Sequence, residues 1–230
     1  MTSELRDQPL LQPRLAWLCA ALAGAAAPAL ALLLLPADVP LAQVGGTILA
    51  VGLMGMGMIA AAADGRLWIG ALLALLTGAG LILLAQALGM APMSHPLATG
   101  LALAIASISF AARGALFARS ALDKGWWIAA FVVAGEAAML VTALVQPGAL
   151  PDWLLVLLPA QWASTAIQTA IAGTGTLAAG SALLALAGTA AATLLVARLW
   201  PRRWPYLIMF TTWLGCSALV WHWPAPPVIP

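Results

Sequence analysis

Long apolar runs, separated by short polar turns, fill almost the whole chain and limit the folds that it can adopt. A run of about 20 residues is the length that an α-helix needs to cross the hydrocarbon core of a bilayer. Lipid offers the backbone no hydrogen-bond partner, so each run has to satisfy its own N–H and C=O groups within a helix. Seven runs are candidates for such helices: Leu15–Leu35, Leu41–Ala63, Leu67–Leu88, Leu97–Ala118, Trp126–Val145, Leu177–Ala197 and Tyr206–Trp221.

The composition agrees with a membrane protein. Hydrophobic residues make up 64% of the chain, charged residues only 7%, and the mean hydropathy is +1.04. A water-soluble globule needs far more polar surface than this. The formal net charge is only +2 and the basic residues stand at the ends of apolar runs, so nothing indicates nucleic-acid binding. The sequence predicts an all-α integral membrane protein, a polytopic bundle whose partner is the lipid bilayer.

Residues 151–175 form an ambiguous eighth segment. They are numerous enough to cross the bilayer, but Pro159 interrupts them, and a proline inside a helix removes a hydrogen bond and clashes with the preceding turn. Several polar side chains also share one helical face here. A complete crossing gives eight transmembrane helices, whereas a re-entrant or interfacial segment gives seven. The polar side chains are Gln161, Ser164, Thr165, Gln168 and Thr169.

The distribution of basic residues favours seven crossings. Positive charges concentrate in cytoplasmic loops, and a cytoplasmic N-terminus also places Arg66 and Lys124 in the cytoplasm. The basic cluster after the sixth run is also cytoplasmic only if residues 151–175 do not cross the membrane completely. We therefore predict the cytoplasmic (inner) membrane as the location, with the N-terminus inside and the C-terminus outside. The cluster consists of Arg198, Arg202 and Arg203.

The domain organisation is simple. Residues 1–14 are expected to form a short cytoplasmic segment, residues 15–223 a single transmembrane helical domain, and residues 224–230 a proline-rich C-terminal tail. Small residues on helix faces let helix backbones approach closely. Such faces suit a tight bundle, self-association or docking on other membrane subunits. They include Gly45, Gly46, Gly52, Gly55, Gly57, Gly78, Gly80, Ser181, Ala185, Gly188 and Ala192.

Glu136 is an acidic residue in the middle of an apolar run, where an isolated charge is costly and therefore a functional candidate. It lies only about 6 Å deeper in the membrane than Arg113 on the preceding helix, and the side chains of the two antiparallel helices lean toward each other. The sequence therefore predicts an intramembrane polar pair of Glu136 and Arg113. Ser109, one turn from Arg113, is expected to complete its hydrogen bonding.

Two interpretations of this pair stay open. The first is structural: the pair locks two helices together or, as a variant, Arg113 extends to the interface and Glu136 is protonated. In the second, Glu136 carries a proton or cation through a cavity. In the second interpretation the polar face of Gln161, Thr165 and Gln168 lines that cavity.

Metal and enzyme chemistry have less support. Met90, Met93 and His95 form an M-x-x-M-x-H pattern on the outer side, and soft thioethers with an imidazole suit Cu(I). The common hydrolase, metalloprotease and phosphate-binding motifs are absent from the sequence. We therefore expect neither an enzyme nor a bound cofactor.

Three functions follow from these observations. The first is a non-catalytic membrane subunit or an assembly factor that packs through small-residue helix faces. The second is a small proton- or cation-coupled transporter or channel that uses Glu136. The third is Cu(I) handling at the outer face through Met90, Met93 and His95.

Overall fold

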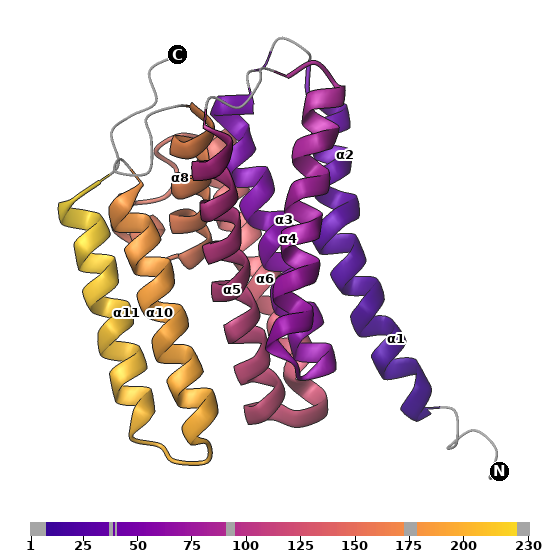
Figure 1. Cartoon of the computed structure of the whole chain (residues 1–230), viewed down its shortest axis with the longest axis vertical. Coiled ribbons are helices and arrows are strands. Elements are labelled where there is room, and N and C mark those ends of the chain that lie inside the picture. Colours follow the sequence, from indigo (N-terminus) through magenta and orange to yellow (C-terminus); the bar gives the residue numbers. More distant parts are fainter. Residues whose placement is uncertain (1–7, 37–38, 40, 91–94, 173–178, 225–230) are drawn as a thin grey trace.

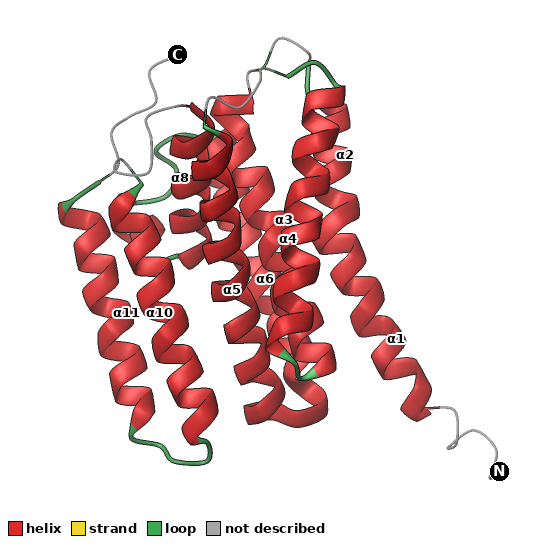
Figure 2. Ribbon diagram, viewed as in Figure 1, coloured by secondary structure: helices red, strands yellow, loops and turns green. Residues whose placement is uncertain are grey.

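The computed structural model describes residues 8–36, 39, 41–90, 95–172 and 179–224, and within them all regular secondary structure is helical (Figures 1 and 2). The N-terminal helix comprises α1 and α2 joined by a π-helical turn, Leu22–Ala26. The helices are α1 (Gln8–Ala21), α2 (Ala27–Leu34), α3 (Leu41–Asp64), α4 (Leu67–Ala87), α5 (Pro96–Ala121), α6 (Gly125–Val145), α7 (Asp152–Val156), α8 (Pro159–Ala172), α10 (Gly180–Leu199) and α11 (Pro205–His222).

The described residues contain five segments that are long and apolar enough to cross a bilayer. One of them, Pro96–Val145, covers two helices, α5 and α6, which are separated by the short 3₁₀ turn Leu122–Lys124. The seventh apolar run forms α11, an 18-residue helix outside these five segments. This architecture agrees with the predicted class, an all-helical membrane protein. The five segments are Arg14–Leu34, Gln43–Asp64, Leu67–Ala87, Pro96–Val145 and Gly180–Leu199.

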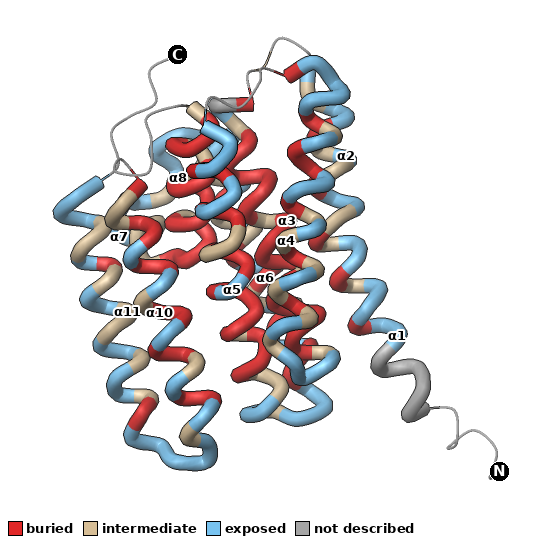
Figure 3. Tube along the Cα trace, in the orientation of Figure 1, coloured by how far each residue is buried: buried red, intermediate tan, exposed pale blue. Residues whose placement is uncertain are grey.

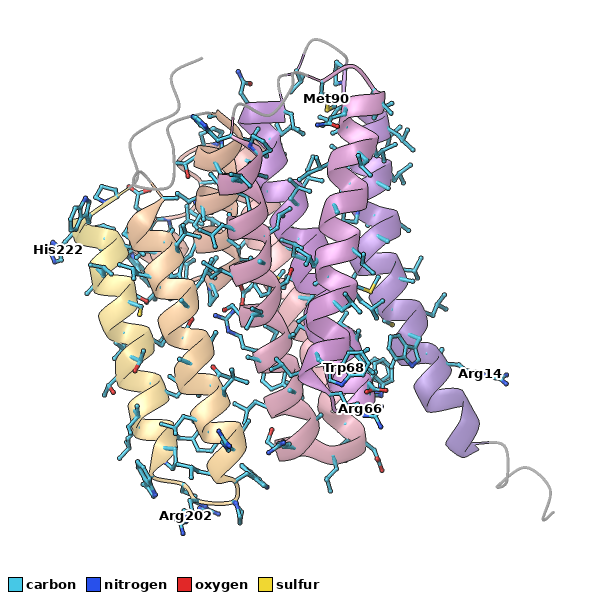
Figure 4. The ribbon with its side chains drawn as sticks, in the orientation of Figure 1. Arg14, Arg66, Trp68, Met90, Arg202 and His222 are labelled. Atoms are coloured by element: carbon cyan, nitrogen blue, oxygen red, sulfur yellow. The ribbon has the colours of Figure 1, made fainter. Side chains whose placement is uncertain are left out.

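The surface of the bundle is apolar along its length. Large side chains such as Leu83 on α4 and Leu207 on α11 are exposed, and buried residues concentrate on the inner helices (Figure 3). Arg14, Arg66 and Arg202 lie toward one end of the bundle, opposite Met90 (Figure 4). An apolar belt with basic residues at one end is typical of a helical bundle in a bilayer.

Helix α3 is the centre of the bundle. It packs against α1, α4, α5, α6 and α8, and most of its residues are buried. Glycines permit this crowding: a Cβ added at Gly55 would lie 2.7 Å from the backbone carbon of Ala23, and a Cβ at Gly114 of α5 would collide with the carbonyl oxygen of Met58. The small residues of α3 therefore serve contacts within the chain.

Residues 151–172 form two short helices instead of one long one. As the sequence predicts, the break lies at Pro159, where α8 begins. Two indole groups satisfy carbonyls near the break: Trp162 Nε1 donates to the Val156 oxygen at 2.7 Å, and Trp213 Nε1 donates to the Leu157 oxygen at 3.1 Å. Buried carbonyls need such partners when a proline interrupts the helix.

Contacts with α3 fix the direction and depth of α8. Gln168 Nε2 donates to the Gln43 oxygen at 3.0 Å, and the hydroxyls of Thr47 and Ser164 are 3.1 Å apart. The two helices are therefore antiparallel, with the C-terminal part of α8 beside the start of α3. One further turn of about 3.6 residues places Ala160 near the middle of α3. Helix α8 thus begins about half-way along the bundle.

Close packing at Gly114 generates a first prediction. In Gly114→Ala the new methyl group meets a neighbouring backbone, and we expect a loss of about 1–3 kcal/mol in stability. Gly100 on the same helix has no atoms within 4 Å of an added Cβ, so Gly100→Ala should be neutral or stabilising, by at most about 1 kcal/mol. Thermal unfolding of both variants in detergent provides the measurement. Equal melting temperatures would contradict the packing described here.

Candidate functional site

A cavity of about 370 Å³ borders the break between α7 and α8. Its walls come from α5, α6, α10, α11 and the residues around Pro159. Four polar side chains line it, Arg113, Glu136, Thr189 and Thr193, and the rest of the lining is apolar. The apolar residues are Leu116, Phe117, Leu157, Leu158, Pro159, Met209, Phe210 and Trp213.

Glu136 caps helix α8 from a neighbouring helix. It lies near the middle of α6 and is only 9% exposed, and its Oε2 accepts a hydrogen bond of 2.9 Å from the backbone N–H of Ala160. Helix α8 starts with Pro159, which has no N–H, so Ala160 presents the first free donor. A carboxylate at this position satisfies that donor and complements the positive end of the helix dipole.

Arg113 is a cation whose hydrogen bonding is incomplete. Its Nη2 donates to the Ser109 hydroxyl at 3.4 Å and to the Thr189 hydroxyl at 3.3 Å, both long for hydrogen bonds. Its Nη1 is buried and has no hydrogen-bond partner among the described residues. The guanidinium carbon lies 5.7 Å from the centroid of the Phe110 ring, which adds a weak cation–π contact. A guanidinium has five donors, so Arg113 retains capacity for an anionic partner.

The two charged side chains share the cavity without a direct ion pair. The ion pair found among the described residues joins Arg66 to Asp64, at 3.8 Å. Arg113 and Glu136 instead lie on the walls of one space, and the other residues that line it carry no charge. Opposite charges attract across such a site more strongly than in water because the surroundings have a low dielectric constant. The cavity therefore holds one cation and one carboxylate, a net charge of zero when both are ionised.

The two threonines of α10 present oxygen acceptors. Thr189 Oγ1 donates to the Ala185 oxygen and Thr193 Oγ1 donates to the Thr189 oxygen, each at 2.7 Å. Their hydroxyl protons are therefore engaged within α10, and their lone pairs remain available. The Thr189 hydroxyl oxygen accepts the hydrogen bond from Arg113 Nη2. Arg113 is thus the group at this site best suited to bind an anion.

The structure brings together part of the site predicted from the sequence. Ser109 contacts Arg113 as expected. Gln161, Thr165 and Gln168 are not among the residues that line the cavity of Glu136. Gln168 bonds to α3, and the Thr165 carbonyl accepts the Thr169 hydroxyl at 2.8 Å. Part of the polar face of α8 therefore serves the contact with α3.

The predicted copper ligands are only partly described. Met90 is buried just after α4, and His95 is exposed immediately before α5, whereas Met93 lies outside the described residues. No cluster of three or more His, Cys, Asp or Glu side chains that could hold a metal is found in the described part of the chain.

Four polar groups of the site were not found from the sequence. They are the Ala160 N–H, the hydroxyls of Thr189 and Thr193, and the indole of Trp213, which come from three different helices. The four-residue spacing of Thr189 and Thr193 in an apolar helix was the available signal for α10. A backbone donor such as Ala160 leaves no such signal. The chain matches no family model, no curated protein and no solved structure, so the interpretation of the cavity rests on its geometry.

The cap on α8 predicts an order of stability for variants of Glu136. Glu136→Gln keeps a carbonyl oxygen that can accept the Ala160 N–H, whereas Glu136→Leu leaves this buried donor without a partner. We expect Glu136→Leu to be less stable than Glu136→Gln by about 1–3 kcal/mol. Unfolding in detergent followed by circular dichroism measures the difference. If the leucine variant is as stable as the glutamine variant, the hydrogen bond does not stabilise α8.

Proposed function

We propose that this chain is a small proton-coupled membrane transporter whose substrate site is the cavity between Arg113 and Glu136. The observation that carries this proposal is the meeting of a buried carboxylate, a half-buried arginine whose Nη1 is buried, and the start of a broken helix around one cavity. Transporters commonly bind substrates and coupling ions where discontinuous helices end inside the membrane. Ionisable residues at such depths are costly and mark pathways for ions and protons.

We further propose a topology of seven crossings, in which α7 and α8 enter and leave the membrane on the outer side. The position of α8 supports it, because this helix starts near the middle of α3 and returns toward the start of α3. Arg66 and Arg202 lie toward the same end of the bundle (Figure 4), which also supports seven crossings because basic residues concentrate on the cytoplasmic side. In this arrangement the N-terminus is cytoplasmic, the C-terminus is outside, and the cavity lies at the tip of the re-entrant pair.

Glu136 is the proton carrier in this mechanism. When ionised, it caps α8 and balances the charge of Arg113 across the cavity. When it takes up a proton, its other oxygen still accepts the Ala160 N–H, so α8 keeps its cap. The attraction between α5 and the wall formed by α6 and α8 then falls. Proton uptake therefore weakens the electrostatic attraction across the cavity while α8 keeps its hydrogen bond to Glu136.

A membrane subunit or assembly factor is the second candidate. Its support is a set of outward-facing glycines on several helices, where an added Cβ would meet no atom within 4 Å. Such positions allow the helix of another protein to approach closely, and copurification from native membranes tests this. Cu(I) handling through Met90, Met93 and His95 stays a prediction from the sequence. The glycines include Gly80, Gly100, Gly135 and Gly215.

Proton transport is tested in liposomes that contain a pH-sensitive dye and the purified protein. We expect at least one solute, from a panel of small organic anions, cations and neutral compounds, to drive proton movement beyond that in protein-free liposomes. Glu136→Gln should abolish this movement because an amide cannot carry the proton. Asp152→Asn is the matched control, because Asp152 is exposed and does not line the cavity. Equal proton movement in Glu136→Gln and the parent would refute the assignment of Glu136.

The topology is tested by cysteine labelling. In a background with Cys19→Ala and Cys216→Ala, Asp123→Cys and Arg202→Cys place single thiols in two different turns. Seven crossings put both thiols on the cytoplasmic side, so an impermeant maleimide should label neither in intact cells and both after permeabilisation. If residues 151–175 cross completely, the two thiols lie on opposite sides. Labelling of Arg202→Cys alone in intact cells would therefore show eight crossings.

A further inference from the structure

Resting on the proposed function, we propose that the substrate is a small amphiphilic organic anion that replaces Glu136 as the counterion of Arg113, and that one proton enters with it. The anionic group binds Arg113, the proton binds Glu136, and the apolar body of the substrate fills the rest of the cavity.

The unmet hydrogen bonding of Arg113 is the first step of the argument. Among the described residues, Nη1 is buried without a hydrogen-bond partner, and Nη2 donates to two hydroxyls at 3.3 and 3.4 Å. A buried polar donor without a partner carries a desolvation cost of about 1–3 kcal/mol, and more when it is charged. The planar fork of a guanidinium matches a carboxylate, which can accept two parallel hydrogen bonds. A carboxylate in the cavity would therefore accept the hydrogen bond from Nη1 that neither Ser109 nor Thr189 accepts.

The charge of the cavity links this binding to a proton. Arg113 of α5 and Glu136 of α6 are the charged side chains that line it, and the lining residues of α10, α11 and the α7–α8 break are uncharged. An additional anion would leave a net charge of −1 in a site of low dielectric constant, which is costly. A proton from water that binds the Glu136 carboxylate removes this excess. The site then holds Arg113 as the cation and the substrate as the anion, and the coupled step moves no net charge.

A cation is a poorer occupant of the same cavity. Glu136 is only 9% exposed, and its Oε2 already accepts the Ala160 N–H. A cation would also lie close to the positive end of α8 and to Arg113, and both repel it. The buried donor that lacks a partner among the described residues, Nη1, belongs to Arg113, the cationic side of the site.

The walls set the nature of the substrate body. Most of the lining residues are apolar, and they include the ring-bearing residues Phe117, Phe210 and Trp213 and the aliphatic residues Leu157 and Leu158. A volume of about 370 Å³ holds roughly a dozen water molecules at about 30 Å³ each. A body with about that many non-hydrogen atoms, apolar and preferably aromatic, suits this space. Benzoate is a probe of this class, and benzamide is its neutral counterpart of similar shape.

Calorimetric titration of benzoate into the protein in lipid nanodiscs, repeated across a pH series, tests the proposal. Above the pH at which Glu136 ionises, the affinity should fall about tenfold for each unit of pH, because one proton binds with each anion. Benzamide should not bind detectably. Glu136→Gln should bind benzoate with an affinity that does not change with pH, because the neutral amide leaves Arg113 permanently without a counterion.

Variants of Arg113 and the separate outcomes complete the test. Arg113→Met should abolish benzoate binding; if that variant does not fold, the comparison of Glu136→Gln with the parent decides. No benzoate binding, equal binding of benzamide, or the same pH dependence in Glu136→Gln and the parent each overturns the proposal. Proton movement that depends on Glu136, driven by other solutes while benzoate does not bind, would overturn the substrate class alone. Proton-linked benzoate binding without transport in liposomes would overturn the transport function and leave the anion site standing.

Discussion

The hydrogen bond from the Ala160 N–H to Glu136 is the interaction on which the centre of this protein depends. A helix that begins inside an apolar bundle exposes backbone donors where neither lipid nor bulk water can satisfy them. Glu136 supplies the acceptor from α6, and the indoles of Trp162 and Trp213 supply donors to the carbonyls on the other side of the break. These contacts let the chain interrupt a helix at Pro159 within the bundle.

Close helix packing holds the scaffold around this break together. Helix α3 contacts helices on several sides, and its contacts with neighbouring backbones leave no room for a Cβ at several glycines. Close backbone packing of this kind gains dispersion energy and excludes lipid from the core. Helix α11, by contrast, is exposed along much of its length and packs chiefly on α10. The lining of the cavity includes residues of both α10 and α11.

Two requirements compete at the cavity. Arg113 needs an anionic partner, and the start of α8 needs a hydrogen-bond acceptor. The carboxylate of Glu136 accepts a hydrogen bond from α8 directly, but it faces Arg113 only across the cavity. This division gives a reason why Glu136 and Arg113, predicted as a polar pair, do not form a direct ion pair in the described structure.

The sequence by itself determined the helical membrane class, the limits of most helices and the break at Pro159, and it predicted a site at Glu136, Arg113 and Ser109. These features follow from local properties: the length of apolar runs, the missing N–H of proline, and the cost of a charge far from water. The tertiary structure decided what those residues contact. The donor to Glu136 is a backbone group of α8, the second hydroxyl partner of Arg113 comes from α10, and Gln168 faces α3 instead of the cavity. Helix rotation and the pairing of distant helices set these contacts, and both depend on how small residues across the whole bundle pack, which no single stretch of sequence encodes.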